Sequence, residues 1–183
     1  MPRGSTWMQR WRVPLGFLCG AAFILLAQPA PPTLVIGGAV ALIGLMMRAW
    51  AAGHIRKNAA LATSGPYAFT RNPLYLGSFV LGLGFTIAAG RPVLLGAIFA
   101  ALFLGIYLPV MRVEATTLTE LFGEEYRRYA GAVPLFVPRV IPYRNELAQG
   151  VKFDASLYLR YREYRAALGL LAALGVLTLK VFL

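Results

Sequence analysis

The sequence has very few of the residues that form metal clusters and disulfide bonds. Its 183 residues include one cysteine, Cys19, and one histidine, His54. A single cysteine excludes a disulfide framework and a cysteine-based zinc cluster, and one histidine cannot build a metal site by itself. We therefore expect neither a metal centre nor a fold that disulfides stabilise.

Charged residues are also scarce, and acidic residues are the scarcest. Only 14% of the residues are charged and 58% are hydrophobic, with 18 Lys and Arg against 7 Asp and Glu. A water-soluble domain of this length does not need so much apolar material. A net charge of +11 would suggest a nucleic-acid partner in a soluble chain, but membrane topology explains it better. The composition predicts an all-α integral membrane protein of one domain, without a nucleic-acid partner.

Five apolar stretches have about the 17–25 residues that a helix needs to cross a bilayer. The first resembles a signal peptide, but its prolines crowd any cleavage point and a second stretch follows almost at once. We interpret it as a span that forms a hairpin with the second, and the third and fourth form another hairpin. The predicted transmembrane helices are residues 13–30, 33–52, 73–90, 92–111 and 166–183.

The distribution of positive charge predicts the orientation of these spans. With the N-terminus in the cytoplasm, every Lys and Arg except Arg91 and Lys180 falls on the cytoplasmic side, as the positive-inside rule requires. All the acidic residues fall on that side. The cytoplasmic face consists of segments 53–72 and 112–165, and the outer loops are too short for a site. We expect a multi-pass protein of a bacterial inner membrane or a plasma membrane, with helices and any active site on the cytoplasmic face.

The chain divides into three parts of one membrane domain. Residues 1–52 form the N-terminal helical hairpin, 53–138 the core with the third and fourth spans, and 139–183 an interfacial helix with the fifth span. Small residues within the spans indicate close packing between helices. They include Gly37, Gly38, Gly77, Gly82 and Gly84.

The last part has the pattern of a helix that lies on the membrane surface. Apolar side chains recur there at helical spacing, with arginines on the other faces, and Asp154 or Ser156 fits the N-cap. We expect an interfacial anchor, and as a functional alternative one wall of a groove for a lipidic ligand. The spaced residues are Leu157, Tyr161, Tyr164 and Leu168.

The loop before the third span has the signals of a turn followed by a helix N-terminus. It reads HIRKNAALATSGPYAFTRNPLYLG over residues 54–77. The Ser-Gly-Pro at 64–66 favours a turn, and Pro73 fits the first turn of a helix. Free N–H groups at such an N-terminus favour a carboxylate or a phosphate. The alternative is an aromatic belt at the membrane interface.

The segment that begins at Arg112 reads RVEATTLTELFGEEYRRYAGAVPLFVP. Its spacing places Glu114, Leu118 and Phe122 on one helix face, and Gly123 is a predicted break. A carboxylate near the membrane is costly unless it is paired, so we expect Arg112 or a cationic ligand as the partner of Glu114. The remaining charges are interpreted as a solvated face: Glu120, Glu124, Glu125, Arg127 and Arg128.

Together the two segments resemble the isoprenylcysteine carboxyl methyltransferase family and its phospholipid methyltransferase relatives. The resemblance rests on GPYAFTRNPLYLG and, after two hydrophobic spans, on E…L…FGEEYRRY…VP, and it covers about residues 54–138. It implies a membrane enzyme that binds S-adenosylmethionine at the cytoplasmic face. The implied acceptor is lipid-like or prenylated and enters from the bilayer.

The resemblance also implies roles for individual residues. By motif position, Arg112 is the candidate that faces the acceptor, and Arg112 and Glu114 are the catalytic candidates. The family has a histidine where this chain has Asn72, and often a second acid where it has Ala115; the amide keeps hydrogen bonding but cannot titrate near neutral pH. The implied cofactor contacts are Lys57, Ala59, Ala60, Leu61, Ala62, Tyr67, Asn72, Pro73, Leu74, Tyr75 and Glu114.

The residues favour O-methylation of a carboxylate, because a carboxylate is ionised at neutral pH and needs no general base. Three alternatives stay open. The first is a phospholipid N-methyltransferase. The second is an NADPH-dependent enzyme like the membrane sterol reductases, which carry a similar Arg-x-Pro-x-Tyr-x-Gly segment. The third is a non-catalytic membrane scaffold, and the sequence identifies neither the acceptor nor the oligomeric state.

Overall fold

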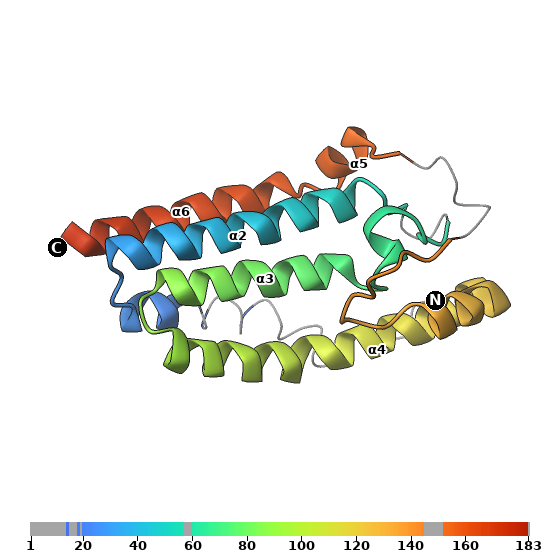
Figure 1. Ribbon diagram of the computed structural model, residues 1–183, viewed down its shortest axis with the longest axis horizontal. Coiled ribbons are helices and arrows are strands. Elements are labelled where there is room, and N and C mark those ends of the chain that lie inside the picture. The colour runs from blue at the N-terminus through green and yellow to red at the C-terminus, as the bar shows by residue number, and fades with distance from the viewer. Residues whose placement is uncertain (1–13, 15–17, 19, 57–59, 145–151, 183) are drawn as a thin grey trace.

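The protein is a bundle of helices, and its computed structural model describes residues 14, 18, 20–56, 60–144 and 152–182. Within these residues there is no strand, which confirms the prediction of an all-α fold. The short helices lie at the same end of the bundle (Figure 1). The long helices are α2 (Pro31–Ala52), α3 (Pro73–Ala88), α4 (Pro92–Ala132) and α6 (Tyr164–Phe182), and the short ones are η1 (Gly65–Ala68) and α5 (Ala155–Arg160).

Length and apolar composition allow α2, α4 and α6 to cross a membrane, whereas α3 is a shorter apolar helix of 16 residues. Helix α3 begins at Pro73 as predicted and ends at Ala88, before a tight turn. Gly90 in that turn has a φ of 77°, and a Cβ there would lie 1.8 Å from the carbonyl oxygen of Gln28, so only glycine fits. The predicted first span falls largely outside the described residues, although residues 20–26 are helical.

Helix α4 continues beyond residue 111, the predicted end of the fourth span, to Ala132. The predicted helical spacing of residues 112–122 agrees with this, since they hold no helix breaker. Its 41 residues correspond to about 60 Å, roughly twice the thickness of a hydrocarbon core. The predicted break at Gly123 is confirmed, since that residue has a φ of 53° and a ψ of −123° inside the helix. Helix α4 is therefore longer than a crossing of the bilayer requires.

Glycines bring α2 and α3 into backbone contact, as the small residues in the spans predicted. A Cβ on Gly44 would lie 2.3 Å from the backbone nitrogen of Leu81, and a Cβ on Gly84 would lie 2.2 Å from that of Ala41. Real side chains do not approach backbone atoms so closely. Small residues are therefore required along this contact, as is typical of helix pairs in membranes.

The predicted interfacial helix is interrupted. Helix α5 ends at Arg160, and α6 begins only at Tyr164. Between them Arg162 has a φ of 55°, which a continuous helix does not allow, and Glu163 forms an ion pair with Arg48 of α2. This tertiary contact accompanies the break, which the helical spacing of the sequence did not predict. The predicted cap is confirmed, because the Asp154 carboxylate accepts a hydrogen bond from a backbone N–H at 2.8 Å.

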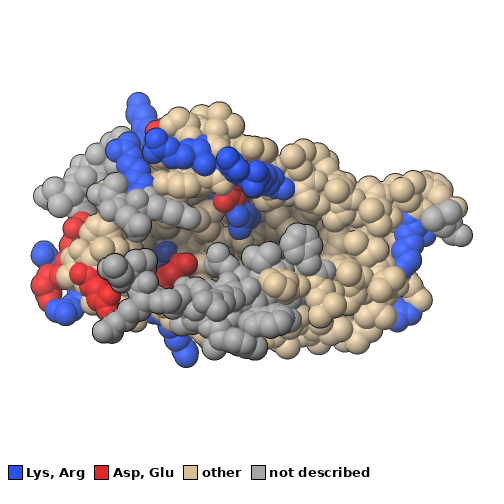
Figure 2. Space-filling view, turned by 180° about the vertical axis from the view of Figure 1, so that it is seen from behind, with Lys and Arg blue, Asp and Glu red and all other residues tan. Residues whose placement is uncertain are grey.

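The segment 133–144, which follows α4, holds the η1 region in place. The backbone N–H of Arg139 donates to the carbonyl of Phe69, and that of Tyr143 donates to the carbonyl of Ala68, both at 2.9 Å. Lys and Arg side chains gather mainly at this end of the molecule, and a broad uncharged stretch separates them from a smaller group at the other end (Figure 2). The two segments predicted to share one side of the membrane thus share one end of the bundle.

Candidate active site

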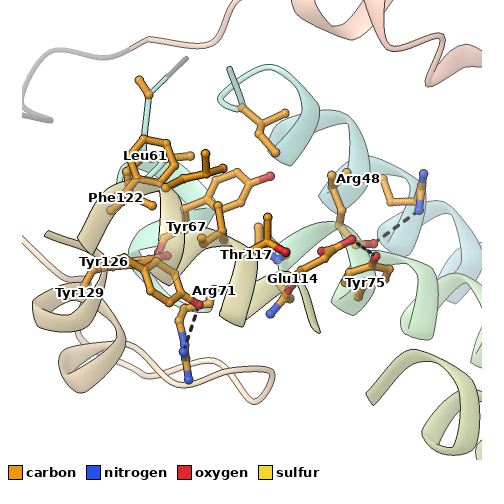
Figure 3. A pocket seen from close by; sticks show the side chains of 18 of the residues that line it. Arg48, Leu61, Tyr67, Arg71, Tyr75, Glu114, Thr117, Phe122, Tyr126 and Tyr129 are labelled. Atoms are coloured by element: carbon orange, nitrogen blue, oxygen red, sulfur yellow. Dashed lines mark hydrogen bonds between the residues drawn. The ribbon is translucent and has the colours of Figure 1, made fainter. Parts of the chain in front are cut away.

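A cavity of about 460 Å³ lies at the end of the bundle that holds η1. Its walls come from the end of α2, the loop through η1, the first turn of α3 and the middle of α4, with Glu163 from the break between α5 and α6. Figure 3 shows side chains from these elements turned toward one space. The loop before α3 and the polar half of α4, which carried the family resemblance, meet here.

Most of the predicted cofactor contacts lie in this cavity. Lys57 and Ala59 are outside the described residues. All the others line the cavity: Ala60, Leu61, Ala62, Tyr67, Asn72, Pro73, Leu74, Tyr75 and Glu114. Two segments that lie about 40 residues apart in the chain therefore supply one site, and the roles of these residues in binding stay predictions.

Glu114 has a different partner from the one expected. Its Oε1 accepts a hydrogen bond from the Tyr75 hydroxyl at 2.7 Å. Arg112 is exposed and does not line the cavity, and no ion pair between it and Glu114 occurs in the described part of the chain. The reason is helical geometry, because side chains that lie two residues apart on a helix such as α4 point to different faces. The structure thus places Glu114 in the site and leaves Arg112 outside it.

The hydroxyl of Tyr67 is buried in the cavity wall and has no hydrogen-bond partner among the described residues. Tyr67 is 6% exposed, and its backbone carbonyl accepts a hydrogen bond from the Tyr129 hydroxyl at 2.7 Å. Burial raises the pKa of the Tyr67 phenol well above its ordinary value, and the nearby Tyr129 adds to the shift. The phenol is therefore neutral at any physiological pH, and it can donate a hydrogen bond to a ligand.

Asn72 and Arg71 form hydrogen bonds between the loop that lines the cavity and the elements beside it. The Asn72 amide donates to the backbone carbonyl of Leu135 at 2.9 Å, which ties the start of α3 to the segment 133–144. Arg71 Nη1 donates to the Tyr126 hydroxyl at 3.2 Å, while its buried Nε has no partner among the described residues. Where the family has a histidine, this chain therefore has a residue that positions the loop.

One wall of the cavity is apolar and aromatic. Leu61 and Phe122 pack against the buried cluster of Tyr126, Tyr129 and Val133. In the view of Figure 3, Tyr67 lies between this wall and the polar group of Thr117 and Glu114. The predicted face of Glu114, Leu118 and Phe122 is confirmed as a cavity face. The solvated face is also confirmed, because the following residues are exposed: Glu120, Glu124, Glu125, Arg127 and Arg128.

The sequence interpretation missed the ion pair between Arg48 and Glu163, which also lines the cavity. Arg48 Nη2 lies 2.7 Å from Glu163 Oε2. A signal was present, because an arginine within an apolar stretch is costly in a membrane and often marks a functional site. Glu163 carried no such signal, since its position depends on the break between α5 and α6. In the described part of the chain, no group of three or more His, Cys, Asp or Glu side chains gathers as a metal site would require.

The fold defines an all-α membrane protein with a cavity at one end of its helices. The family model for phospholipid methyltransferases matches residues 33–125. The chain belongs to this family.

Individual relatives cover parts of the chain. The cobalt-zinc-cadmium resistance protein CzcN of Cupriavidus metallidurans is 38% identical over 116 residues, which are 61% of this chain and 50% of that protein. Protein-S-isoprenylcysteine O-methyltransferase of Homo sapiens is 32% identical over 94 residues, which are 51% of this chain and 30% of that protein. The Mus musculus protein of the same name is 32% identical over 87 residues, which are 48% of this chain and 30% of that protein. The chain thus spans about half the length of CzcN and less of the methyltransferases. No solved structure matches the chain significantly.

Proposed function

We propose that this protein transfers a methyl group from S-adenosylmethionine to a lipidic acceptor at the cytoplasmic face of a membrane. The proposed acceptor group is a carboxylate like that of an isoprenylcysteine. The observation that carries the proposal is the convergence of nine expected cofactor contacts, from two separate segments, on one cavity. Membership of the phospholipid methyltransferase family supports the same reaction class.

The cavity residues fit the parts of S-adenosylmethionine. The apolar wall of Leu61, Phe122 and Tyr126 suits a flat adenine ring. Glu114 suits the ammonium group or the ribose hydroxyls. The Nε of Arg71 has no partner within the described ranges and suits the carboxylate. The Tyr67 hydroxyl, which also lacks a partner there, supplies a further donor. When bound, the cofactor supplies an electrophilic methyl group on a positively charged sulfur.

The protein's own residues then have to position and enclose the reactants. A carboxylate acceptor is ionised at neutral pH, so no side chain has to remove a proton. The hydrogen bond of Tyr129 holds the η1 loop against α4, and that of Asn72 ties the start of α3 to segment 133–144. Alignment of two bound reactants is the main contribution that such a displacement needs.

The experiment is a methyl-transfer assay with the purified full chain in lipid nanodiscs and tritium-labelled S-adenosylmethionine. Three acceptors are compared: S-farnesyl-N-acetylcysteine, its primary amide, and phosphatidylethanolamine. We expect label in the farnesyl carboxylate only, and its loss in Glu114→Ala. Arg127→Gln, at an exposed position far along α4, is the matched control and should keep full activity.

Label in phosphatidylethanolamine instead would identify a phospholipid N-methyltransferase and overturn the proposed acceptor. No label in any acceptor, together with oxidation of NADPH by a sterol substrate, would overturn the methyltransferase proposal.

A further inference from the structure

Arg48 lies where two cavities meet. It lines the candidate active site and also a second cavity of about 440 Å³, which α3, α4, α6 and residues 20–24 also line. Apart from Arg48 and Ser78, the described residues that line the second cavity are apolar; Leu81, Phe85, Phe99 and Leu170 are the large ones on α3, α4 and α6. A charged group thus stands between a polar site and a hydrocarbon-like space.

The guanidinium of Arg48 is held in a fixed orientation. Its Nε and Nη2 donate to Glu163 Oε2 at 3.1 and 2.7 Å. Its Nη1 donates to the Ser78 hydroxyl and, at 3.4 Å, to the carbonyl of Leu74. The Arg48 and Glu163 side chains are only 22% and 13% exposed to solvent. Because an unpaired charge in such surroundings costs several kcal/mol, Arg48 requires an anionic partner at all times.

Glu163 is a partner that can be exchanged. It lies at the break between α5 and α6, next to Arg162 with its φ of 55°, and therefore outside regular helix. Its carboxylate offers the guanidinium the same chemistry as a carboxylate on a ligand, which a guanidinium binds well through two parallel hydrogen bonds. A ligand with an apolar tail in the second cavity would bring its headgroup to Arg48.

We propose that Arg48 binds the anionic headgroup of the lipidic acceptor and selects it over neutral lipids, and that Glu163 is the resting partner that this headgroup displaces. The inference rests on the proposed function and specifies which residue recognises the acceptor. Arg48 takes the role for which the sequence suggested Arg112, which lies outside the cavity. The Ser78 and Leu74 bonds keep the guanidinium in place during the exchange.

The test measures lipid binding without any methyl donor, so that it does not depend on methyl transfer. The full chain in phosphatidylcholine nanodiscs binds tritium-labelled S-farnesyl-N-acetylcysteine, and the unlabelled acid and its primary amide compete. We expect wild-type protein to prefer the acid at least about tenfold, which corresponds to about 1.4 kcal/mol. Arg48→Gln should bind both lipids equally, and Glu163→Gln should bind the acid more tightly while its affinity for the amide stays unchanged.

Two further variants separate recognition from folding and from surface charge. Arg48→Gln leaves Glu163 unpaired, so the double variant Arg48→Gln/Glu163→Gln removes both charges and should fold yet show no preference for the acid. Arg160→Gln changes an exposed arginine of α5 at the same end and should keep the wild-type preference. Equal binding of acid and amide by the wild type, or an acid preference that survives in the folded double variant, would overturn the proposal. Loss of methyl transfer with an intact acid preference would instead count against the proposed function alone.

Discussion

The buried hydroxyl of Tyr67 has no partner among the described residues. We therefore predict that its removal raises the stability of the ligand-free protein and lowers the affinity for the cofactor. A buried hydroxyl without a partner costs about 1–3 kcal/mol, and Tyr67 is such a group among the described residues. Tyr67→Phe removes the hydroxyl and keeps the ring, so the ligand-free protein should gain about 1 kcal/mol or more. For a chain of this length that corresponds to a rise in Tm of about 2–4 °C.

The same free energy should appear as a loss of cofactor affinity. When a ligand accepts a hydrogen bond from the Tyr67 hydroxyl, the wild type regains the free energy that the unpaired hydroxyl cost. The Tyr67→Phe variant has no hydroxyl and gains nothing from this contact. Affinity for S-adenosylhomocysteine should therefore fall about tenfold, or about 1.4 kcal/mol. Thermal unfolding in detergent and calorimetric titration measure the two quantities on the same preparation.

Tyr129→Phe is the matched control for this pair of measurements. It removes a buried tyrosine hydroxyl that does have a partner, the Tyr67 carbonyl at 2.7 Å. Its loss should lower stability by about 1–2 kcal/mol, the opposite sign to Tyr67→Phe. The reasoning is refuted if Tyr67→Phe lowers the Tm of the ligand-free protein, or if it raises the Tm and leaves the affinity unchanged.

Further variants test the packing, the loop and the carboxylate. Gly44→Ala places a Cβ 2.3 Å from the backbone of α3, so it should cost about 1–3 kcal/mol or more and lower the Tm; Gly96→Ala, with no atom within 4 Å, should not. Asn72→Ala removes the bond to the Leu135 carbonyl and should lower stability by about 1 kcal/mol in the same thermal assay; an unchanged Tm would show that the bond does not hold the loop. Glu114→Gln should weaken S-adenosylhomocysteine binding about tenfold in calorimetry, through loss of a charged hydrogen bond. Unchanged affinity in folded Glu114→Gln protein would remove this residue from the site.

Features with local or periodic causes could be predicted from the sequence. The turn before Pro73, the break at Gly123 and the Asp154 cap follow from backbone preferences of single residues. The face of Glu114 and Phe122 follows from helical spacing.

Features that depend on long-range contacts could not be predicted. The break between α5 and α6 accompanies the ion pair of Arg48 and Glu163, which lie 115 residues apart in the chain. The register of α4 turned Arg112 away from the cavity, although a motif position had suggested it. The Leu135 carbonyl became the partner of Asn72 only because segment 133–144 folds back onto the η1 loop. A tertiary contact decided the outcome for the break and for Asn72, and the helical register of α4 decided it for Arg112.

The central claim is that the cavity between the η1 loop and α4 binds S-adenosylmethionine. The most direct test is calorimetric titration of the purified full chain with S-adenosylmethionine, S-adenosylhomocysteine and NADPH. The account predicts saturable binding of the first two ligands, loss of that binding in Tyr67→Ala and Glu114→Ala, and retention in Arg127→Gln. Binding of NADPH alone, or S-adenosylmethionine binding that both cavity variants leave intact, would contradict it.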